Sequence, residues 1–401
     1  MTVSQWKRTQ RMGRAQCDAI VVGAGICGLS MAVHLRRRGL SVMVVDRRSA
    51  GSGASTRNAG FLMRGCADNY ALAVKEYGRA RAKALWKLTE ENLAGLRREG
   101  ISALPGVRDV PSVLLALEEG ELRELRESVT LMSEDGFEVE WQESGTDSAW
   151  RSGVALGGLV NPRDASCNSR EVIEHIAGVA KGLGAVVHEH QEVFAIDAAG
   201  SGLVTRTTDA MIESGRVVLC TNAFTPLLVP QLQGVVTPRR GQMLAMEPRG
   251  LRLDASYYAN RGSEYFRQAA DGTIVVGGCR TYHAEREVGY EDRVTPWVQR
   301  DIERFASLML GIELDDVQAR VTARWAGTMG FTPHHLPVIT RVPVPGECAT
   351  AAVHAVKDAP PHENLWFVGG FTGHGMSMAY RTSEVACGVM VRGQENVFGV
   401  P

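Results

Sequence analysis

The chain lacks any long apolar run. No stretch of its 401 residues approaches the roughly 18 consecutive apolar residues that a membrane span requires. The segment Met1–Gln16 also lacks the apolar region of a secretory signal. We therefore expect a cytoplasmic protein without a membrane span, in which residues 1–16 form a flexible, basic N-terminus.

Sequence patterns that bind metals are missing as well. The eight cysteines include no C-x-x-C pair, and the ten histidines include no H-E-x-x-H motif. We expect reduced thiols and no metal site. A net charge of −1 gives the protein no overall field that would attract nucleic acid or an anionic membrane. The composition is that of an ordinary globular protein, and the length favours two domains.

A glycine-rich turn near the N-terminus is the first positive signal. An apolar strand precedes it, and an amphipathic helix is predicted after it at Ile26–Arg38. In the motif GAGICG, Gly23 permits the tight turn, Gly25 lets a pyrophosphate approach the backbone, and Gly28 lets the helix pack on the strand. Asp46 ends the next strand, where an acidic side chain accepts hydrogen bonds from an adenosine ribose. The unit predicts a dinucleotide site.

The rest of the chain alternates helical and strand patterns without an internal repeat. Helices are predicted at 69–98, 119–134, 168–183, 296–310 and 376–391. Strands are predicted at 17–22, 41–46, 113–117, 186–190, 192–197, 203–206, 216–219, 242–247, 257–265, 273–277 and 365–368. The short strands between 235 and 326 indicate a second, β-rich layer.

Six segments carry a family resemblance. They are the dinucleotide unit CDAIVVGAGICGLSMAVHLRRRGLSVMVVDR, the loop GSGASTRNAGF, the central segment that starts GLVNPRD, the strand and turn VVLCTNAFTPLL, the segment RWAGTMGFTPHHLPVI, and the C-terminal turn and helix NLWFVGGFTGHGMSMAYRTSEVACGVM. In this order they resemble the D-amino-acid-oxidase-like superfamily of FAD enzymes, which includes glycine oxidase, sarcosine oxidases and gamma-glutamylputrescine oxidase. The resemblance extends from Cys17 to Arg392.

The resemblance implies an α/β fold. A Rossmann-type FAD-binding domain would be interleaved with an α+β substrate domain built on a largely antiparallel sheet. The FAD-binding segments would be 17–65, 150–234 and 327–396, and the substrate-binding segments 66–149 and 235–326. FAD contacts are implied for Gly23, Gly25, Ile26, Cys27, Gly28, Asp46, Arg47, Ser55, Thr56, Arg57, Asn58, Ala59, Val193, Thr221, Asn222, Gly370, Gly373, His374, Gly375 and Met376. The last five would line the flavin pyrimidine edge, where helix N–H groups stabilise negative charge.

Several family positions carry other residues here. Gly327 stands where sarcosine oxidases have a cysteine bonded to the flavin, and Arg57 where dimethylglycine-type enzymes have a bonded histidine. We therefore expect FAD to bind non-covalently. Met329 replaces the carboxylate-binding arginine of glycine oxidase, Val275 falls near the oxygen-activating lysine of monomeric sarcosine oxidase, and His334 replaces an acid. Glycine and sarcosine are therefore poor substrate candidates.

The substrate residues must come from other positions. Tyr265 and Arg267 are two apart on one predicted strand and so face the same side. An arginine can grip a carboxylate bidentately. Arg64 follows the loop Gly51–Phe61, which we call the flavin loop because in the family it runs beneath the flavin, and His374 lies in the C-terminal turn. Weaker candidates are Tyr257, Tyr258 and His335. Each arginine has an alternative as a surface charge or structural ion pair, because 38 of the 44 basic residues are arginine.

The family chemistry is oxidation of a small amine or amino acid. Hydride transfer from the α C–H bond of a neutral amine to flavin N5 gives an imine, and O2 then takes the electrons and yields H2O2. Two alternatives stay open. One is an amine dehydrogenase that passes electrons to a quinone or protein partner, and the other is a non-catalytic FAD-binding subunit of a complex. The sequence does not determine the identity or the stereochemistry of the amine. It also leaves open whether the protein forms an oligomer.

Overall fold

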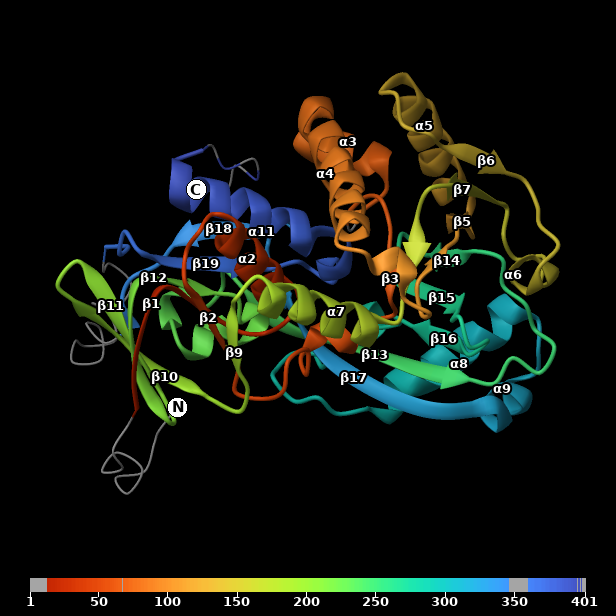
Figure 1. Cartoon of the computed structure of the whole chain (residues 1–401). Helices are drawn as coiled ribbons and strands as arrows, with labels where there is room; N and C mark the ends of the chain where they lie inside the picture. Colours follow the sequence, from red (N-terminus) through yellow and green to blue (C-terminus); the bar gives the residue numbers. More distant parts are fainter. Residues whose placement is uncertain (1–12, 67, 346–359, 395, 397, 399–401) are drawn as a thin grey trace.

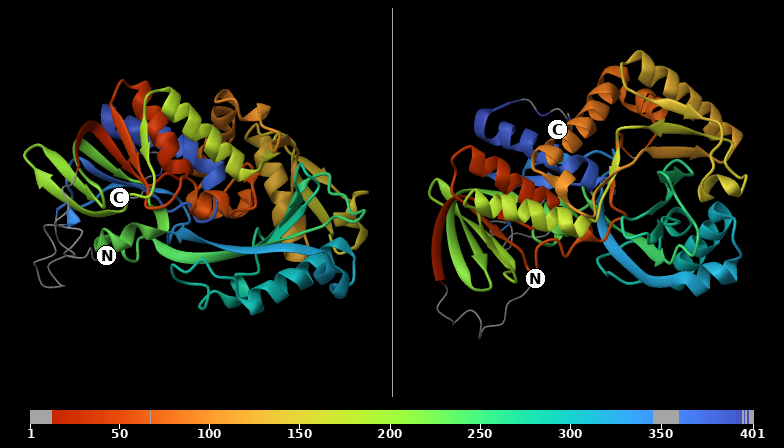
Figure 2. Two further views of the ribbon diagram at one scale, coloured as in Figure 1. Left: turned by 60° about the horizontal axis from the view of Figure 1, so that its bottom comes forward. Right: turned by 45° about the vertical axis from the view of Figure 1, so that its right-hand side comes forward.

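The computed structural model describes residues 13–66, 68–345, 360–394, 396 and 398, and Figures 1 and 2 show its arrangement. Two eight-stranded sheets and one three-stranded sheet organise these residues. No helix in these ranges is long and apolar enough to cross a membrane. We expected residues 1–16 to be flexible, and residues 1–12 lie outside the described part of the chain. The expectation was wrong for 13–16, which pair in parallel with 210–213 because strand pairing uses the backbone and needs no apolar side chains.

The first sheet is built around β1 (Gly13–Val22). This strand pairs in parallel with β2 (Val42–Val45) on one side and with β12 (Ala210–Leu219) on the other. Its side chains from Ala19 to Val21 are fully buried. The outer strands are β9 (Val186–His188), β10 (Val193–Ala199), β11 (Gly202–Thr207), β18 (Val338–Arg341) and β19 (Leu365–Gly369). Continuous burial of the central strand is typical of a parallel sheet covered on both faces.

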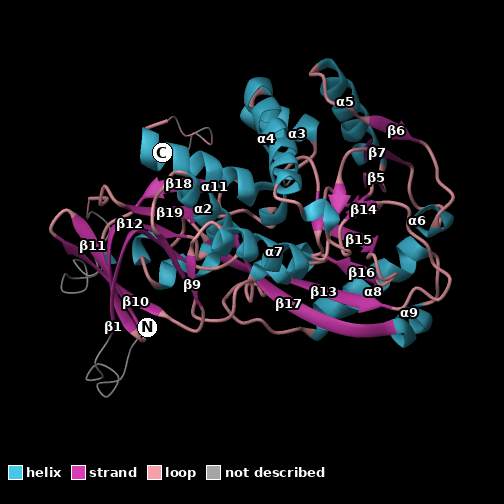
Figure 3. Ribbon diagram, viewed as in Figure 1, coloured by secondary structure: helices cyan, strands magenta, loops and turns pink. Residues whose placement is uncertain are grey.

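Helices cover one face of this sheet (Figure 3). α2 (Ile26–Arg37) packs against both α7 (Ser169–Gly182) and α11 (Gly375–Arg392), and α11 also packs against α4 (Arg79–Arg98). The opposite face has its own core, to which η4 (Pro230–Leu232) contributes. The glycine-rich turn and the start of α2 are therefore held rigidly at the carboxyl end of β1.

The second sheet is antiparallel apart from one pair of its described strands, β14 and β5. Its order is β17 (Val321–Phe331), β13 (Thr237–Met246), β16 (Ile274–Gly277), β15 (Glu264–Gln268), β14 (Ser256–Ala259), β5 (Ser112–Ala116), β7 (Gly157–Asn161) and β6 (Glu140–Gln142). Helix α8 (Pro296–Leu310) packs on β13 and β16, and α9 (Leu314–Arg320) and α6 (Ser148–Arg151) pack on α8. Helix α5 (Glu119–Glu134) packs on β5 and β7. The predicted α/β class with a largely antiparallel second sheet is confirmed.

Short elements complete the described chain. The three-stranded sheet contains β3 (Phe61–Leu62), β8 (Ala165–Ser166) and β4 (Arg108–Asp109). The 3-10 turns besides η4 are η1 (Ala54–Thr56), η2 (Ile101–Ala103), η3 (Asn222–Leu227) and η5 (Thr281–His283). Strand β3 packs against α11, so the loop after η1 passes between the two large sheets.

Two predicted elements are divided in the structure. The helix expected over 69–98 consists of α3 (Tyr70–Tyr77) and α4, because Gly78 adopts a φ of +82° that interrupts the helical backbone. The strand expected over 257–265 is the hairpin β14–β15, whose turn includes Asn260 and Arg261 with positive φ. This turn reverses the chain beside the cavity described below.

The domain division stays a prediction, but the sheets show where its boundaries need adjustment. β7 falls in the segment 150–234 that we assigned to FAD binding, yet it pairs with β5 and β6 in the second sheet. The proposed boundary at 326–327 lies inside β17, a continuous strand of the second sheet. One long strand therefore runs from the second sheet into the cofactor region.

Candidate cofactor and substrate site

Residues from both large sheets line one cavity of about 340 Å³, and a second cavity of about 140 Å³ lies along the glycine-rich turn. The two cavities share lining residues, including Gly25, Ser55 and Asn222. Together they form an extended site that begins at the carboxyl end of β1 and ends against β13, β15 and β17. In open α/β sheets, ligands bind at this end of the strands.

The glycine-rich turn is shaped by close backbone contacts. Gly23 has a φ of +105°, and a Cβ atom on it would lie 2.9 Å from the carbonyl oxygen of Cys220 on the neighbouring strand. A Cβ atom on Gly28 would overlap the carbonyl oxygen of Gly23. Both positions therefore exclude a side chain. The N-terminus of α2 consequently reaches close to β1, with the positive end of its dipole facing the cavities.

Asp46 closes the turn from the next strand. One carboxylate oxygen accepts the N–H of Ala24 at 2.8 Å, and the other accepts the N–H of Arg48 at 2.8 Å. Burial raises the pKa of Asp46, against the effect of these hydrogen bonds. The side chain lines the smaller cavity. Its predicted role as an acceptor for ribose hydroxyls stays a prediction.

The loop around η1 lies against the N-terminus of α2. Ser55 Oγ accepts the N–H of Ile26 at 3.0 Å, and a Cβ atom on Gly25 would lie 2.8 Å from this oxygen. Asn58 bonds back to the carbonyl oxygens of Ala54 and Ser55 at 3.1 and 2.8 Å. The loop is thereby preformed, with a narrow backbone cradle that suits the pyrophosphate of FAD.

Arg57 fixes the same loop to the second sheet. Its Nη1 donates to the carbonyl oxygen of Ala326 at 2.9 Å, and its own carbonyl accepts the indole N–H of Trp325 at 3.1 Å. A Cβ atom on Gly327 would lie 2.8 Å from the Cβ atom of Arg57. The position where sarcosine oxidases carry their flavin-bonded cysteine is therefore tightly packed against Arg57.

The C-terminal turn forms another wall. Asn222, which has a φ of +46°, accepts the N–H of Gly370 through Oδ1 at 2.9 Å. His374 caps α11, and its Nδ1 donates to the carbonyl oxygen of Thr372 at 3.0 Å, since a carbonyl can only accept. Burial lowers the pKa of His374, so its ring is neutral at pH 7. The Nε2 atom is then an acceptor.

Most of the predicted cofactor residues line the two cavities. Those in the larger cavity are Gly25, Ile26, Cys27, Ser55, Arg57, Asn58, Ala59, Asn222, Gly373, His374, Gly375 and Met376. Those in the smaller cavity are Gly23, Gly25, Asp46, Arg47, Ser55, Val193, Thr221 and Asn222. Gly28, Thr56 and Gly370 line neither cavity. Close packing at the two glycines and a hydrogen bond from Thr56 to the backbone give these residues a role in the local backbone structure. The set as a whole fits FAD, and its direct contacts stay a prediction.

Two of the four predicted substrate residues lie away from the cavity. Arg64 is buried, and its guanidinium bonds to the carbonyl oxygen of Glu138 at 2.7 Å and to Glu90 at 2.8 Å. Arg267 is buried behind the flavin loop and donates to the carbonyl oxygens of Ala59 and Cys167. Neither lines a cavity. Both guanidinium groups bond to backbone carbonyl oxygens. Their contacts therefore fit the alternative in which an arginine has a structural role.

The other two candidates, Tyr265 and His374, do line the larger cavity. Tyr258 and His335 line it as well, whereas Tyr257 is buried elsewhere and donates its hydroxyl to Asp147 at 2.5 Å. Burial raises the pKa of Tyr265 to about 12 and that of Tyr258 further. Both phenols therefore stay protonated at neutral pH and can donate a hydrogen bond into the cavity.

Sequence reasoning missed Arg280 and Asp68, which also line the larger cavity. The guanidinium carbon of Arg280 lies 4.6 Å from the centre of the Phe331 ring. Neither charged group has a hydrogen-bond or ion-pair partner in the part of the chain that the structure describes. Arg280 follows the turn after a predicted strand, and this position was the only signal available in the sequence.

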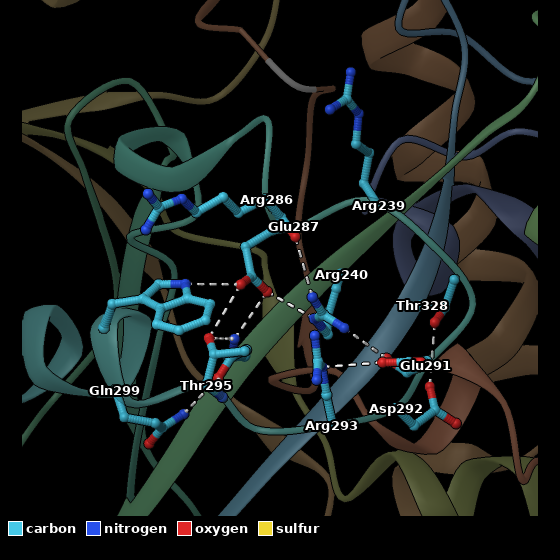
Figure 4. Close-up of polar contacts among 12 residues, drawn as sticks. Arg239, Arg240, Arg286, Glu287, Glu291, Asp292, Arg293, Thr295, Gln299 and Thr328 are labelled. Atoms are coloured by element: carbon cyan, nitrogen blue, oxygen red, sulfur yellow. Dashed lines mark hydrogen bonds and ion pairs between the residues drawn. The ribbon is translucent and has the colours of Figure 1, made fainter.

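A buried polar cluster fixes the loop 281–295 (Figure 4). The carboxylate of Glu287 is inaccessible to solvent and lies 2.7 Å from Nε of Arg240 on β13. It also accepts hydrogen bonds from Gln242 at 2.8 Å and Thr295 at 3.0 Å. Burial alone would raise the pKa of Glu287, but Arg240 and the other donors outweigh burial and lower it. The carboxylate therefore stays ionised and ties the loop to the sheet.

The same loop reaches the junction of the two cavities. Asp292 lies 3.4 Å from Arg48 and 3.7 Å from Arg57. It also accepts the hydroxyl of Thr328 at 3.2 Å (Figure 4). The ring centre of Tyr290 lies 5.4 Å from that of Phe224, which lines the smaller cavity. The loop that the cluster around Glu287 fixes therefore contacts residues that line both cavities.

No group of three or more His, Cys, Asp and Glu side chains suited to a metal ion occurs among the described residues.

Comparison with known proteins is more informative. The family model described as "DAO: FAD dependent oxidoreductase" matches residues 18–387. Glycine oxidase from Geobacillus kaustophilus is 26% identical over 345 residues, which cover 84% of this chain and 87% of that protein.

Two further proteins are similar over nearly the whole chain. Gamma-glutamylputrescine oxidoreductase from Escherichia coli is 24% identical over 401 residues, which cover 91% of this chain and 81% of that protein. The crystal structure of L-proline dehydrogenase from P. horikoshii matches with a TM-score of 0.76 at 18% identity and covers 96% of both chains. The sequence matches and the fold match therefore cover the same, almost complete, part of the chain.

Proposed function

The chain belongs to the DAO family of FAD-dependent oxidoreductases, and from this membership we propose that it oxidises a small amine that carries a carboxylate, such as an amino acid. FAD bound along the two cavities would supply a hydride acceptor for the α C–H bond of the substrate, and O2 would then take up the electron pair with two protons to give H2O2. The substrate is thereby oxidised to an imine, which water hydrolyses. The names of the similar oxidases and dehydrogenase support a substrate of this class.

The observation that carries the proposal is the guanidinium of Arg280. It lines a cavity that also contains the predicted flavin-binding residues, and no acid among the described residues forms an ion pair with it. Burial lowers the pKa of Arg280, which is the cost of keeping a cation in this site. A substrate carboxylate would supply the missing charge, and the hydroxyls of Tyr258 and Tyr265 are available as further donors. Met329 therefore need not be an arginine for an amino acid to bind.

Apolar side chains complete the substrate cavity. Ala59, Phe61 and Met243 line the larger cavity, and with Met63 and Val275 behind them they form one hydrophobic cluster. An ammonium group is disfavoured beside such a wall, since desolvation favours the neutral form of an amine. The neutral form has the lone pair that an imine requires. These residues support hydride transfer by orienting a neutral amine in a dry site, without a dedicated acid–base pair.

The electron acceptor is a separate question. Val275, which stands near the family position of the oxygen-activating lysine, is buried in the hydrophobic cluster, and no lysine lines the larger cavity among the described residues. This observation favours a second candidate function, in which a quinone or protein partner takes the electrons in place of O2. The H2O2 formed per substrate oxidised in air separates the two, with one equivalent expected for an oxidase and none for a dehydrogenase.

The test of the proposed function is an anaerobic titration of the purified holoprotein with amino acids of both configurations and with their decarboxylated amines. We expect the flavin absorption to bleach with at least one amino acid and less readily with the matching amine. The flavin should also appear in the supernatant after acid precipitation, because the packing of Gly327 against Arg57 supports non-covalent binding. Bleaching by decarboxylated amines alone would contradict the carboxylate, and no bleaching by any compound would contradict amine oxidation.

A further inference from the structure

The cavity holds one unneutralised acid as well as one unneutralised arginine. Four Asp, Glu, Lys or Arg side chains line it, namely Arg57, Asp68, Arg261 and Arg280. Arg57 lies 3.7 Å from Asp292, and Arg261 lies 3.0 Å from Glu118 and 2.9 Å from Glu124. Two of the four charges are therefore compensated within the described chain, and Asp68 and Arg280 are not.

Asp68 and Arg280 do not compensate each other. No ion pair joins them, so their charged atoms are more than 4.0 Å apart even though both face the same cavity. They come from different walls. Asp68 lies between β3 and α3, where its charge acts on His374 and Tyr77, whereas Arg280 follows β16 and its charge acts on Tyr265. The cavity therefore presents a negative and a positive group from separate elements.

Partial burial removes part of the water around both charges, and a ligand that carries the opposite charges would replace that lost hydration. From this we infer that the substrate carries a second cationic group besides its reacting amine, and that Asp68 binds that group while Arg280 binds the carboxylate. The substrate class is an α-amino acid with a basic side chain. This inference rests on the proposed function and adds the chemistry of the substrate's far end.

Asp68 is poorly suited to bind the reacting amine instead. A carboxylate in contact with that nitrogen would stabilise the ammonium form, which has no lone pair to form the imine. At a distal ammonium or guanidinium the same contact is productive, since that group keeps its charge throughout the reaction. The two placements predict different behaviour of substrates that lack the distal charge, and the test below separates them.

The test uses pairs of amino acids that differ only in the distal charge. Ornithine is compared with norleucine, and lysine with 2-aminoheptanoate, in both configurations, by anaerobic stopped-flow reduction of the flavin. A charge-assisted hydrogen bond contributes about 1.5–3 kcal/mol, so we expect kcat/KM to favour the basic member about 10- to 100-fold. In Asp68→Asn this preference should disappear, because kcat/KM falls far more for the basic member of each pair than for the neutral one.

A matched control removes an acid outside the cavity. Glu76 is exposed on α3, only a few residues from Asp68, and Glu76→Gln should retain the full preference. The inference is overturned if the wild-type protein does not prefer the basic members, or if Asp68→Asn lowers kcat/KM equally for both members of a pair. The first criterion needs no variant, so it stands even if Asp68→Asn fails to fold.

A binding measurement separates failure of this inference from failure of the proposed function. The melting temperature of the holoprotein is measured with 4-guanidinobutanoate and with pentanoate, neither of which has an α-amine. Stabilisation by the guanidino acid at lower concentrations than by pentanoate, lost in Asp68→Asn, supports the distal site whether or not any amino acid is oxidised. Equal effects of the two acids on the wild-type protein would overturn the distal site, even if amino acids bleach the flavin.

Discussion

At the scale of single residues, a substitution of Arg280 tests whether this side chain binds the substrate carboxylate without affecting the rest of the reaction. Arg280→Gln should lower kcat/KM for an amino acid about 10- to 100-fold or more, because a charge-assisted contact is lost. The effect on the decarboxylated amine should be small. Steady-state kinetics with such a pair measures both values.

The control for this variant is Arg286→Gln, which removes the same charge from an exposed position six residues along the chain. It should leave both substrates unaffected. An equal loss for the amino acid and the amine in Arg280→Gln would mean that Arg280 shapes the cavity or the flavin environment and does not bind the carboxylate.

Asp164 makes the stability of the protein depend on pH. It is buried, accepts the N–H of Arg64 at 3.0 Å and the hydroxyl of Ser112 at 2.5 Å, and burial raises its pKa to about 7. The folded protein therefore keeps a proton that the unfolded chain releases near pH 4, so this residue's contribution to stability falls as pH rises to about 7.

Asp164→Asn should remove this dependence. Relative to wild type, its free energy of unfolding should increase by about 2 kcal/mol between pH 5 and pH 8, since each unit of pKa shift corresponds to about 1.4 kcal/mol. Urea denaturation at the two pH values measures the difference. A wild-type-like pH profile in the variant would show that Asp164 is ionised in the folded protein at pH 5.

The residue roles that the sequence predicts well are those imposed by backbone geometry. Gly23 and Gly28 are required because a Cβ atom at either position meets a carbonyl oxygen, and the spacing of the motif expresses that constraint directly. Arg64 and Arg267 illustrate the opposite case. Both follow sensible positional arguments, yet their guanidinium groups bond to carbonyl oxygens away from the cavity. Where a long side chain ends depends on partners far away in sequence, which one sequence does not reveal.

At the scale of elements, the loop 281–295 is held in place by the ion pair of Arg240 with Glu287. Glu287→Gln leaves the buried cation without a counter-charge, and we expect it to lower the free energy of unfolding by about 3 kcal/mol or more. Chemical denaturation of the holoprotein measures this loss. The exposed pair of Arg170 with Glu174 is the control, where Glu174→Gln should have no measurable effect.

A second substitution identifies the cause of that loss. If the unpaired cation is responsible, Arg240→Met combined with Glu287→Gln should recover part of the stability, because replacing both members of a buried pair costs less than removing one. A double variant less stable than Glu287→Gln would instead assign the loss to the hydrogen bonds that Arg240 makes to the backbone of the loop.

A comparison of the predicted and observed bounds of helices and strands shows which sequence patterns predict an element reliably. α5 and α8 occupy the predicted ranges because strong amphipathic periodicity and defined ends coincide. Gly78 divides a pattern that continues on either side of it, so the periodicity of the flanking residues concealed the break between α3 and α4. β7 was not predicted, since its sequence GGLVN has little strand propensity and its pairing with β5 and β6 comes from tertiary context.

At the scale of the whole molecule, the site is assembled from segments far apart in sequence. The turn after β1, the η1 loop, η3, the hairpin β14–β15, β17 and the start of α11 all contribute walls to it (Figures 1 and 2). The family match covers 18–387, the same span that contains these segments. A cofactor that contacts so many of these segments should stabilise both sheets together. Because several of the segments carry recognisable cofactor motifs, the sequence predicted the cofactor better than the substrate.

The most direct test of the central claim is the visible spectrum of the purified protein during anaerobic titration with amino acids. We predict a flavin spectrum that bleaches with an amino acid of one configuration, and more readily with a basic one than with its neutral counterpart. A flavin spectrum that no amine or amino acid bleaches would contradict amine oxidation. A protein that neither contains nor takes up FAD would contradict the assignment of the two cavities to that cofactor.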